Sequence, residues 1–338
     1  MKKYSFKNDY SEGAHPSILN RLIETNLDQQ IGYGLDDYCN EARELIQEKI
    51  DKKVDIHFVS GGTQANLIVI SSILKPYESV IATESGHIAV HETGAIEATG
   101  HKVNTIATTD GKLTPKHIAQ VLALHTDEHM VKPRLVYISN TTEVGSVYNK
   151  AELTAIYDLC QENNLILFID GARLSSALTS SKCDLTFNDI ANLTDVFYIG
   201  GTKNGALIGE AIVINNPKVN EDFRYNIKQK GGMLAKGRLI GIQFAEMFKN
   251  DLFFEMGKHA NRLAEKLAIG LKAKGFSFLT EPSSNQIFPI LPNDIIEKLH
   301  KNYEFFVWEK IDENKSAIRL VTSWATLEEK VDQFLENL

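Results

Sequence analysis

Residues 165–173, LILFIDGAR, and residues 196–214, VFYIGGTKNGALIGEAIVI, decide the fold of this chain. Each stretch starts with an unbroken apolar run of strand length and then reaches glycines and charged residues. Unbroken apolar runs are typical of strands that helices cover on both faces of a sheet. Ligands of such sheets bind beyond the ends of the strands. The two stretches therefore predict buried strands that end at a ligand site.

The same alternation of short strands and helices continues on both sides of these stretches. Further strand-like runs lie at residues 56–60, 79–83, 103–108 and 134–140, and the run at 210–214 closes the series. Helical patterns separate them at 62–74, at 87–99, after Thr114-Pro115 and at 150–164. Strands separated by helices of this length indicate a mainly parallel sheet. The sequence thus predicts the α/β class, with a large domain built on a mainly parallel seven-stranded sheet.

The pattern changes near residue 237. A long helical stretch is followed by short strand-like runs at 276–280, 286–290, 304–311 and 317–323. A last helix is expected to open at Thr326, because Glu329 three residues later completes a capping-box spacing. These features predict a smaller C-terminal α+β domain. We divide the chain into an N-terminal segment (1–40), a large cofactor-binding domain (41–236) and a small domain (237–338).

Composition limits the partners and the compartment. The formal net charge of -8 argues against nucleic acid or an anionic membrane surface as the main partner. No apolar run approaches the roughly 18 residues of a membrane span. The three cysteines, Cys39, Cys160 and Cys183, are scattered without a CxxC spacing, which indicates reduced thiols. With no signal peptide evident in the first residues, we expect a cytoplasmic protein.

Lys203 stands among glycines between two apolar runs. Lysine is seldom placed where its ammonium cannot reach water. Glycines let the backbone approach a flat cofactor, and a buried amine is easily deprotonated into a nucleophile. A lysine on an ordinary hairpin between two strands explains this segment equally well.

Asp170 and Arg173 follow the apolar run that begins at residue 165. A carboxylate at a protonated pyridine nitrogen keeps a cofactor ring electron-withdrawing, which suits Asp170. An aspartate that merely caps the following helix is the alternative. Arg173 can reach the same cavity and form a bidentate pair with a substrate carboxylate.

Residues 60–66, SGGTQAN, and His87 add two further features at strand ends. A glycine-rich turn that opens a helix offers backbone N–H groups to a phosphate, although the motif is neither a Walker loop nor a GxGxxG fingerprint. A turn without a ligand is the alternative. His87 at a helix start can stack on a pyridine ring. His87 and His91 also have metal-ligand spacing, but HIAVH lacks the glutamate of a zincin and no third ligand follows, so we expect no metal site.

In this order the motifs closely resemble the threonine aldolase family, among the beta-eliminating lyases of the aspartate-aminotransferase-like fold (fold type I) of pyridoxal-phosphate enzymes. The resemblance covers almost the whole chain. FIDGAR followed by GGTKN is its most specific part, and SGGTQAN, GAIEATGH (94–101) and RLVT (319–322) support it.

The resemblance implies a role for each matching residue. Lys203 would carry pyridoxal 5'-phosphate as a Schiff base, Asp170 would pair with the ring nitrogen and His87 would stack on the ring. The phosphate would be held by Gly62, Thr63 and Thr202. Substrate contacts would come from Arg173, Arg319, Asn8 and Tyr33, the last from a neighbouring subunit. The implied reaction is cleavage of a β-hydroxy amino acid of L-threonine or L-allo-threonine type to glycine and an aldehyde, in a homodimer or homotetramer with active sites at the interfaces.

Three departures from the family pattern concern the substrate side of the site. Asn8 stands where the family has a serine, Thr142 replaces a histidine near the substrate hydroxyl, and Leu234 follows Met233 where the family has an arginine. The catalytic base is therefore open between His87 and a phosphate-bound water. Beta-elimination, racemisation and transamination remain alternatives, because the bond that breaks is the one perpendicular to the cofactor ring. A cofactor-binding regulatory protein without turnover is the alternative outside enzymes.

Overall fold

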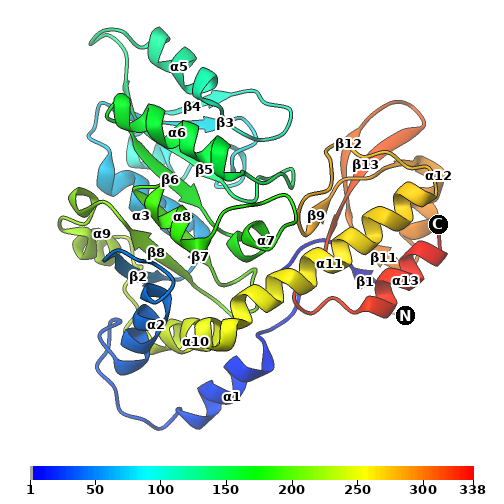
Figure 1. The fold of residues 1–338 in the computed structure, drawn as a ribbon, viewed down its shortest axis with the longest axis horizontal. Coiled ribbons are helices and arrows are strands. Elements are labelled where there is room, and N and C mark those ends of the chain that lie inside the picture. Colours follow the sequence, from blue (N-terminus) through cyan, green and yellow to red (C-terminus); the bar gives the residue numbers. More distant parts are fainter. Residues whose placement is uncertain (1–2) are drawn as a thin grey trace.

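The computed structural model describes residues 3–338, which form a large and a small part joined by one long helix (Figure 1). The large part surrounds a seven-stranded sheet, and the small part carries both ends of the described chain (Figure 1). The joining helix is α11 (Leu252–Ala273). Within residues 3–338, no helix is long and apolar enough to cross a membrane.

The large sheet confirms the seven predicted strands. Its spatial order is β2-β8-β7-β6-β5-β3-β4. The strands are β2 (Asp55–Val59), β3 (Glu78–Thr83), β4 (Val103–Ile106), β5 (Lys132–Ser139), β6 (Ile166–Asp170), β7 (Val196–Gly200) and β8 (Glu210–Ile214). Strands β4, β3, β5, β6 and β7 are mutually parallel, whereas β8 is antiparallel to both β7 and β2. The sheet is therefore mainly parallel, and its carboxyl edge gathers the predicted site residues.

The sheet is buried on both faces because successive side chains of a strand point to opposite sides. In β6, Leu167 and Ile169 belong to one hydrophobic cluster, while Ile166 and Phe168 belong to another. The elements around the sheet are α2 (Asp37–Gln47), α3 (Gly62–Ile73), α5 (Pro115–Leu124), α6 (Lys150–Glu162), α7 (Leu174–Leu178), α8 (Phe187–Asn192), η2 (Pro217–Val219), α9 (Phe223–Gln229) and α10 (Arg238–Phe248). This double cover explains the unbroken apolar strands in the sequence.

The predicted helix over 87–99 is wrong in its length. The structure forms only α4 (His87–Val90) and a 3-10 turn, η1 (Glu97–Thr99). Between them Thr93 and Gly94 have φ values of 53° and 71°, a left-handed conformation that ends a right-handed helix. The interruption turns Glu92 back toward His87, which matters for the site.

The small part contains a four-stranded sheet and a separate two-stranded sheet. Its elements are β9 (Gln286–Ile287), β10 (Ile290–Pro292), α12 (Asn293–Leu299), β11 (Tyr303–Glu304), β12 (Phe306–Lys310), β13 (Lys315–Val321) and α13 (Glu328–Glu336). The N-terminal strand β1 (Tyr4–Ser5) pairs with β11, so the start of the described chain joins this part. Phe6 is buried in the same hydrophobic cluster as Phe334.

Three details of the small part differ from the sequence prediction. Residues 276–280 form no strand and contribute only the isolated bridge between Phe278 and Pro289. The runs at 286–290 and 304–311 are each divided, into β9 and β10 and into β11 and β12. Helix α13 begins at Glu328, because the Thr326 hydroxyl accepts from the Ser323 amide at 2.8 Å and caps nothing.

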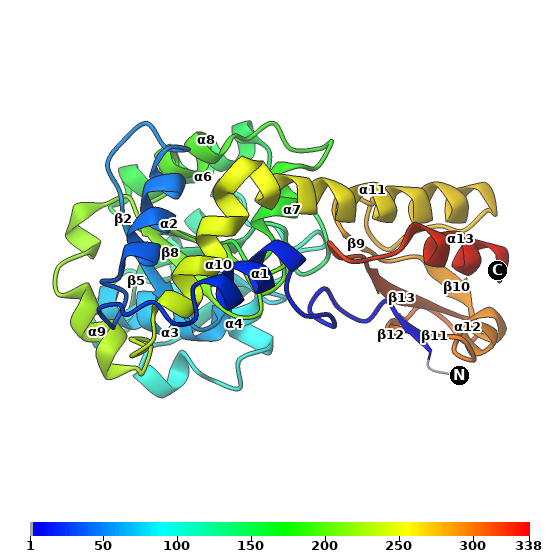
Figure 2. The same ribbon diagram turned by 90° about the horizontal axis from the view of Figure 1, so that it is seen from below.

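The division at residues 40 and 236 remains a prediction, and the packing favours a later boundary. Helices α1 (Pro16–Glu24) and α2 pack on α10, which lies on the large part together with them (Figure 2). The turn η3 (Lys249–Asp251) then leads into α11. Met256 of α11 belongs to the cluster of the large sheet, whereas Leu263 belongs to that of the small part. We propose that the boundary lies within α11.

Candidate active site

A cavity of about 370 Å³ lies at the carboxyl edge of the large sheet. It is lined by seven of the residues predicted from the sequence: Gly62, Thr63, His87, Asp170, Arg173, Thr202 and Lys203. Tyr10, Thr141, Glu143, Tyr198 and Glu210 also line it. The topology thus brings together residues that are up to 141 positions apart (203 − 62) in the sequence.

Asp170 ends β6 as a buried carboxylate with four hydrogen-bond donors. The Tyr137 hydroxyl donates to Oδ2 at 2.6 Å, the Tyr198 hydroxyl to Oδ1 at 2.5 Å, and the Asn66 amide to Oδ2 at 3.2 Å. The backbone N–H of Ala172 adds a bond of 3.0 Å to Oδ1. Burial alone would raise the pKa of Asp170, but the charge of His87 and the two tyrosine hydroxyls outweigh it and lower the pKa. Asp170 is therefore held ionised, as a protonated ring nitrogen requires.

His87 begins α4 and has both its backbone and its ring fixed. Its Nδ1 lies 2.7 Å from Oε1 of Glu92, and its backbone N–H donates to Oε1 of Glu143 at 2.9 Å. Burial works to lower the pKa of His87, but the hydrogen bond to Glu92 and the charge of Asp170 raise it above the usual value. The imidazole is thus tied at one nitrogen and borders the cavity.

Lys203 lies in the loop between β7 and β8. Gly205, two residues later, has φ 90°, and a Cβ there would lie 2.4 Å from the sulfur of Met256, so the loop requires glycine at this position. Burial, together with the nearby charge of Arg173, lowers the pKa of the Lys203 amine, while Asp9, Asp170 and Glu210 oppose that shift. A lowered pKa favours the neutral amine, which is the nucleophilic form.

The N-terminus of α3 faces the same cavity through Gly62 and Thr63. The first N–H groups of a helix have no partner within it, so they are free for an anion. A Cβ at position 62 would lie 2.9 Å from the Tyr198 hydroxyl, which holds Asp170. Glycine at this position therefore leaves room between the N-terminus of α3 and the Asp170 carboxylate. Thr202 and Lys203 border the cavity as well.

These residues fit pyridoxal phosphate, the cofactor that the resemblance implies. A helix N-terminus with Thr63 and Thr202 suits its phosphate, the ionised Asp170 suits its ring nitrogen, and Lys203 supplies an amine. The buried Thr141 hydroxyl, which borders the cavity, has no hydrogen-bond partner within residues 3–338. An unpaired buried hydroxyl beside such a cavity is explained by a polar ligand that supplies the partner.

Arg173 and Arg319 have different partners. Arg173 donates from Nε and Nη2 to the two carboxylate oxygens of Asp9, at 2.6 and 3.0 Å. The guanidinium of Arg319 lies over the rings of Phe306 and Trp308, and its Nη2 donates to the Lys7 carbonyl at 3.0 Å. Within the described chain the buried Nε of Arg319 has no partner. Burial and the neighbouring Arg173 charge lower the pKa of Arg319.

Besides Arg319, three residues singled out from the sequence lie outside this cavity's lining, namely Asn8, Thr142 and Tyr33. Asn8 accepts from the Tyr10 amide at 3.1 Å and from the Ser11 hydroxyl at 2.9 Å, so it shapes the turn next to Asp9. Thr142 is buried, and its hydroxyl bonds to Ser146 at 2.8 Å. Thr142 therefore does not substitute for the family's histidine.

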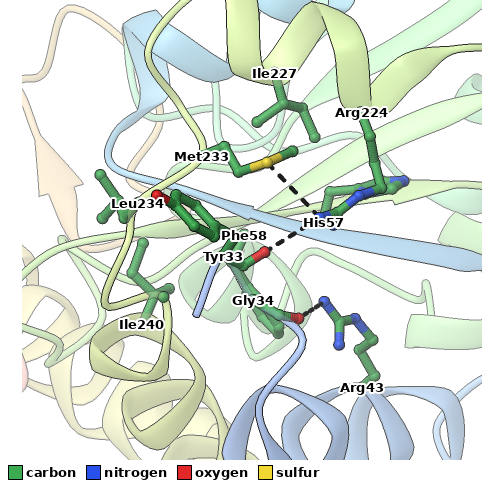
Figure 3. A pocket seen from close by; sticks show the side chains of 11 residues that line it. Tyr33, Gly34, Arg43, His57, Phe58, Arg224, Ile227, Met233, Leu234 and Ile240 are labelled. Carbon is green, nitrogen blue, oxygen red and sulfur yellow. Dashed lines mark hydrogen bonds between the residues drawn. The ribbon is translucent and has the colours of Figure 1, made fainter. Parts of the chain in front are cut away.

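Tyr33, the third of them, lines a different, small cavity between α9 and α10 (Figure 3). Arg224 donates to its carbonyl at 3.3 Å, and Arg43 donates to the carbonyl of Gly34 at 2.7 Å (Figure 3). Its ring is about half exposed, with the Lys228 ammonium 4.8 Å from the ring centroid. A contact of Tyr33 with a neighbouring subunit's site stays a prediction.

The sequence analysis missed four acids at this site, namely Glu210 and the partly buried Glu143 in the cavity lining, Glu92 at His87 and Asp9 at Arg173. Glu210 accepts the Gly201 amide at 2.7 Å, and burial raises its pKa to about 8. Glu143 accepts the Ser139 hydroxyl at 2.7 Å, and burial also raises its pKa. Glu210 had a signal in the sequence, because a glutamate that begins a buried apolar strand needs a partner. Glu143 in a polar turn had none.

Comparison with known proteins gives the family. A family model described as beta-eliminating lyase matches residues 9–293. The low specificity L-threonine aldolase of Pseudomonas aeruginosa is 32% identical over 337 residues, which covers 98% of this chain and 96% of that protein. A solved structure of Leishmania major threonine aldolase is 50% identical, with a TM-score of 0.97 and 98% of both chains covered. An aspartate aminotransferase of Thermus thermophilus, 16% identical with a TM-score of 0.73 over 99% of this chain and 90% of that chain, shares the fold. The chain therefore belongs to the beta-eliminating lyase family, within its threonine aldolase group.

Proposed function

We propose that this chain is a pyridoxal-phosphate-dependent aldolase that cleaves a β-hydroxy amino acid of L-threonine or L-allo-threonine type to glycine and an aldehyde. The observation that carries the proposal is the single cavity that joins the ionised Asp170, the Lys203 amine and the anion cradle at Gly62. Enzymes of this family use pyridoxal phosphate, and two similar proteins are named threonine aldolases. These relatives support the reaction and the substrate class.

The proposed cofactor contacts follow from the geometry of the cavity. The phosphate would be bound by the first turn of α3 at Gly62 and Thr63, with Thr202 beside it. Asp170 would hold a proton on the ring nitrogen, and the His87 imidazole would lie against the ring. When bound, pyridoxal phosphate supplies an electron sink for the pair released at the substrate's α-carbon.

The substrate contacts decide which bond reacts. Arg319 and Nη1 of Arg173, which has no hydrogen bond within residues 3–338, would bind the α-carboxylate. They would so fix the rotation of the substrate about the bond between its nitrogen and Cα. That rotation sets which Cα bond stands perpendicular to the ring. Arg319 is suited to this role because its buried Nε has no partner within residues 3–338. In this scheme Lys203 also moves protons, since its pKa is lowered by burial.

Beta-elimination is the second candidate, because the description of the matching family names it. The two reactions give different products. We would incubate the purified protein with L-threonine, L-allo-threonine, phenylserine and L-serine, and assay aldehyde, glycine, pyruvate and ammonia separately. Equal amounts of aldehyde and glycine support the aldolase, whereas pyruvate with ammonia and no glycine would replace it with an eliminating lyase.

We also propose a homodimer or homotetramer in the cytoplasm. Three apolar side chains in and after α1, those of Ile23, Leu27 and Ile31, are mostly exposed, Leu27 to 90%. These three side chains lie within nine residues of sequence, and we propose that they take part in a contact between subunits. The three cysteines are free thiols, which suits a reducing compartment.

A further inference from the structure

We infer that Glu92 and Asn66 are positioning residues that hold His87 as the group which takes the proton of the substrate's β-hydroxyl. The inference rests on the proposed aldolase function. It starts from an unbroken hydrogen-bonded chain that runs from His87 to the ring-binding carboxylate, and it assigns a base to the reaction.

Three side-chain hydrogen bonds connect His87 to Asp170. Nδ1 of His87 lies 2.7 Å from Oε1 of Glu92, the amide of Asn66 donates to the same Oε1 at 2.7 Å, and it also donates to Oδ2 of Asp170 at 3.2 Å. Asn66 is 1% exposed and Glu92 6%. A single amide group therefore bridges two buried carboxylates from the first turns of α3.

This arrangement leaves polar atoms unsatisfied. Oδ1 of Asn66 and Oε2 of Glu92 are buried and have no partner within the described residues. Each such atom costs roughly 1–3 kcal/mol. Apolar side chains would give a more stable fold if these positions served packing alone. We therefore explain the buried polar cluster by its role in orienting His87 and Asp170.

The hydrogen bonds that run from His87 through Glu92 and Asn66 fix the tautomer of His87. Oε1 of Glu92 is an acceptor, so the proton of a neutral imidazole must stay on Nδ1. Nε2 is then the ring nitrogen that can exchange protons with the cavity. The charged and titratable groups around the imidazole are Glu92, Asp170, Lys203 and His91, with Glu143 at its backbone N–H. The two carboxylates Glu92 and Asp170 favour the imidazolium that forms when Nε2 accepts a proton.

The proton transfer balances as follows. The β-hydroxyl O–H bond breaks and its proton moves to Nε2 of His87. The oxygen electron pair forms the carbonyl of the aldehyde, and the Cα–Cβ pair remains on Cα, which is protonated later to give glycine. Thr142 is buried and bonded to Ser146, so it offers no competing base.

The test compares Glu92→Gln with Glu97→Gln, which removes an exposed carboxylate in the same segment. In Glu92→Gln the side-chain oxygen still accepts from Asn66 and from Nδ1 of His87, but the negative charge that favours the imidazolium is lost. Nε2 of His87 then becomes a weaker base. Loss of a positioned base costs about 10²–10⁴-fold in rate. In the holoenzyme, cleavage by Glu92→Gln should fall by about tenfold or more within that limit. The acidic limb of its pH–kcat profile should move to lower pH, because the carboxylate that raises the pKa of His87 is gone.

Exchange of the glycine α-proton with D₂O provides the internal control, because it needs the cofactor but no β-hydroxyl base. Glu92→Gln should keep its cofactor absorbance and its exchange rate within about threefold of wild type, since the proton from Cα is not moved by His87 in this scheme. Glu97→Gln should match wild type in both reactions. Equal losses of cleavage and exchange, or unchanged cleavage, would overturn the positioning role.

A measurement on the wild type covers the case in which Glu92→Gln does not fold. Nitrogen-15 NMR of histidine-labelled holoenzyme, with His87→Gln to assign the signal, should show Nδ1 protonated in the neutral imidazole, and an Nε2-protonated tautomer would contradict the inference. If the wild type exchanges glycine protons but cleaves no β-hydroxy amino acid, both the proposed function and this inference are wrong. If the wild type cleaves and Glu92→Gln cleaves equally well, only the inference fails.

Discussion

Arg173 and Asp9 form an ion pair with two hydrogen bonds, of 2.6 Å from Nε to Oδ2 and 3.0 Å from Nη2 to Oδ1. Asp9 is 1% exposed and also accepts the Asn285 amide at 2.9 Å. The carboxylate therefore ties the N-terminal segment to both the large and the small part. Because Asp9 occupies Nε and Nη2, Nη1 is the Arg173 nitrogen without a hydrogen bond within residues 3–338, so the bidentate edge of this guanidinium is already taken.

Asp9→Asn should destabilise the fold by about 3–5 kcal/mol, because it leaves the mostly buried Arg173 charge, 12% exposed, without its ionic partner. The control is Glu304→Gln, which breaks the exposed pair between Lys7 and Glu304 at 3.9 Å. Exposed pairs of this kind contribute at most about 1 kcal/mol. Urea unfolding of both variants measures the difference. Equal, small effects would show that the pair between Asp9 and Arg173 does not hold the parts together.

Arg319→Lys should keep its bound cofactor and lose activity on every amino-acid substrate. Lysine retains the charge but not the planar pair of donors that matches a carboxylate. A charge-assisted hydrogen bond contributes roughly 1.5–3 kcal/mol, so kcat/KM should fall at least about tenfold to a hundredfold. If Arg319 only fastens the small part, the variant will instead show a lower Tm with near-normal kinetics. Cofactor content, Tm and kinetics of one preparation decide between these outcomes.

Lys203→Ala should abolish the visible absorbance of the purified protein, because the cofactor loses its covalent attachment. Borohydride should trap the cofactor of the wild type on Lys203, as read by peptide mass mapping. Lys258→Ala, in which an exposed lysine of α11 is removed, is the matched control and should keep both properties. A trapped adduct on any other lysine would disprove the cofactor assignment.

Glu210→Gln should make the cofactor-free protein more stable than wild type, by an amount that grows with pH. In the unfolded chain a glutamate has a pKa of about 4.3, whereas burial raises the pKa of Glu210 in the fold to about 8. Between these values the folded wild type binds more protons than the unfolded chain, so its stability falls as pH rises. The difference in Tm should level off above about pH 8. Lys203 and Asp170, the charges that face Glu210, are present in both proteins, and a Tm difference that does not vary with pH would contradict this account.

Leu27→Glu combined with Ile31→Glu should reduce the assembly to a smaller species, because both side chains are exposed in the described chain and a charge there opposes burial in a contact. Light scattering of wild type and variant gives the masses, and Leu124→Glu, at another exposed apolar position, is the control. A wild type that is fully active as a monomer would refute the proposed assembly.

Local patterns were enough to predict the seven strands of the large sheet, and the residues predicted to hold the cofactor lie at the ends of these strands. Each of these signals is local, because an apolar run and the glycine, lysine or aspartate at its end are neighbours in the sequence. A parallel sheet then places all such strand ends along one edge. Smaller features were predicted less well. The left-handed Thr93 and Gly94 ended the expected helix after Val90, and the strands of the small part were divided at residues whose pairing depends on distant partners.

By itself the sequence determined the α/β class and the order of the motifs, and it predicts a cofactor site at Lys203, Asp170 and the Gly62 turn. Only the tertiary structure decided how their supporting side chains pair. Asp9 meets Arg173 across 164 residues, and Asn66 meets Asp170 across 104. Such contacts depend on which strands become neighbours in the sheet and on the paths of the loops. They cannot be predicted from the local periodicity of the sequence. The physical reason is that a buried polar atom needs a partner in space, and the fold alone determines which residue lies within hydrogen-bond distance.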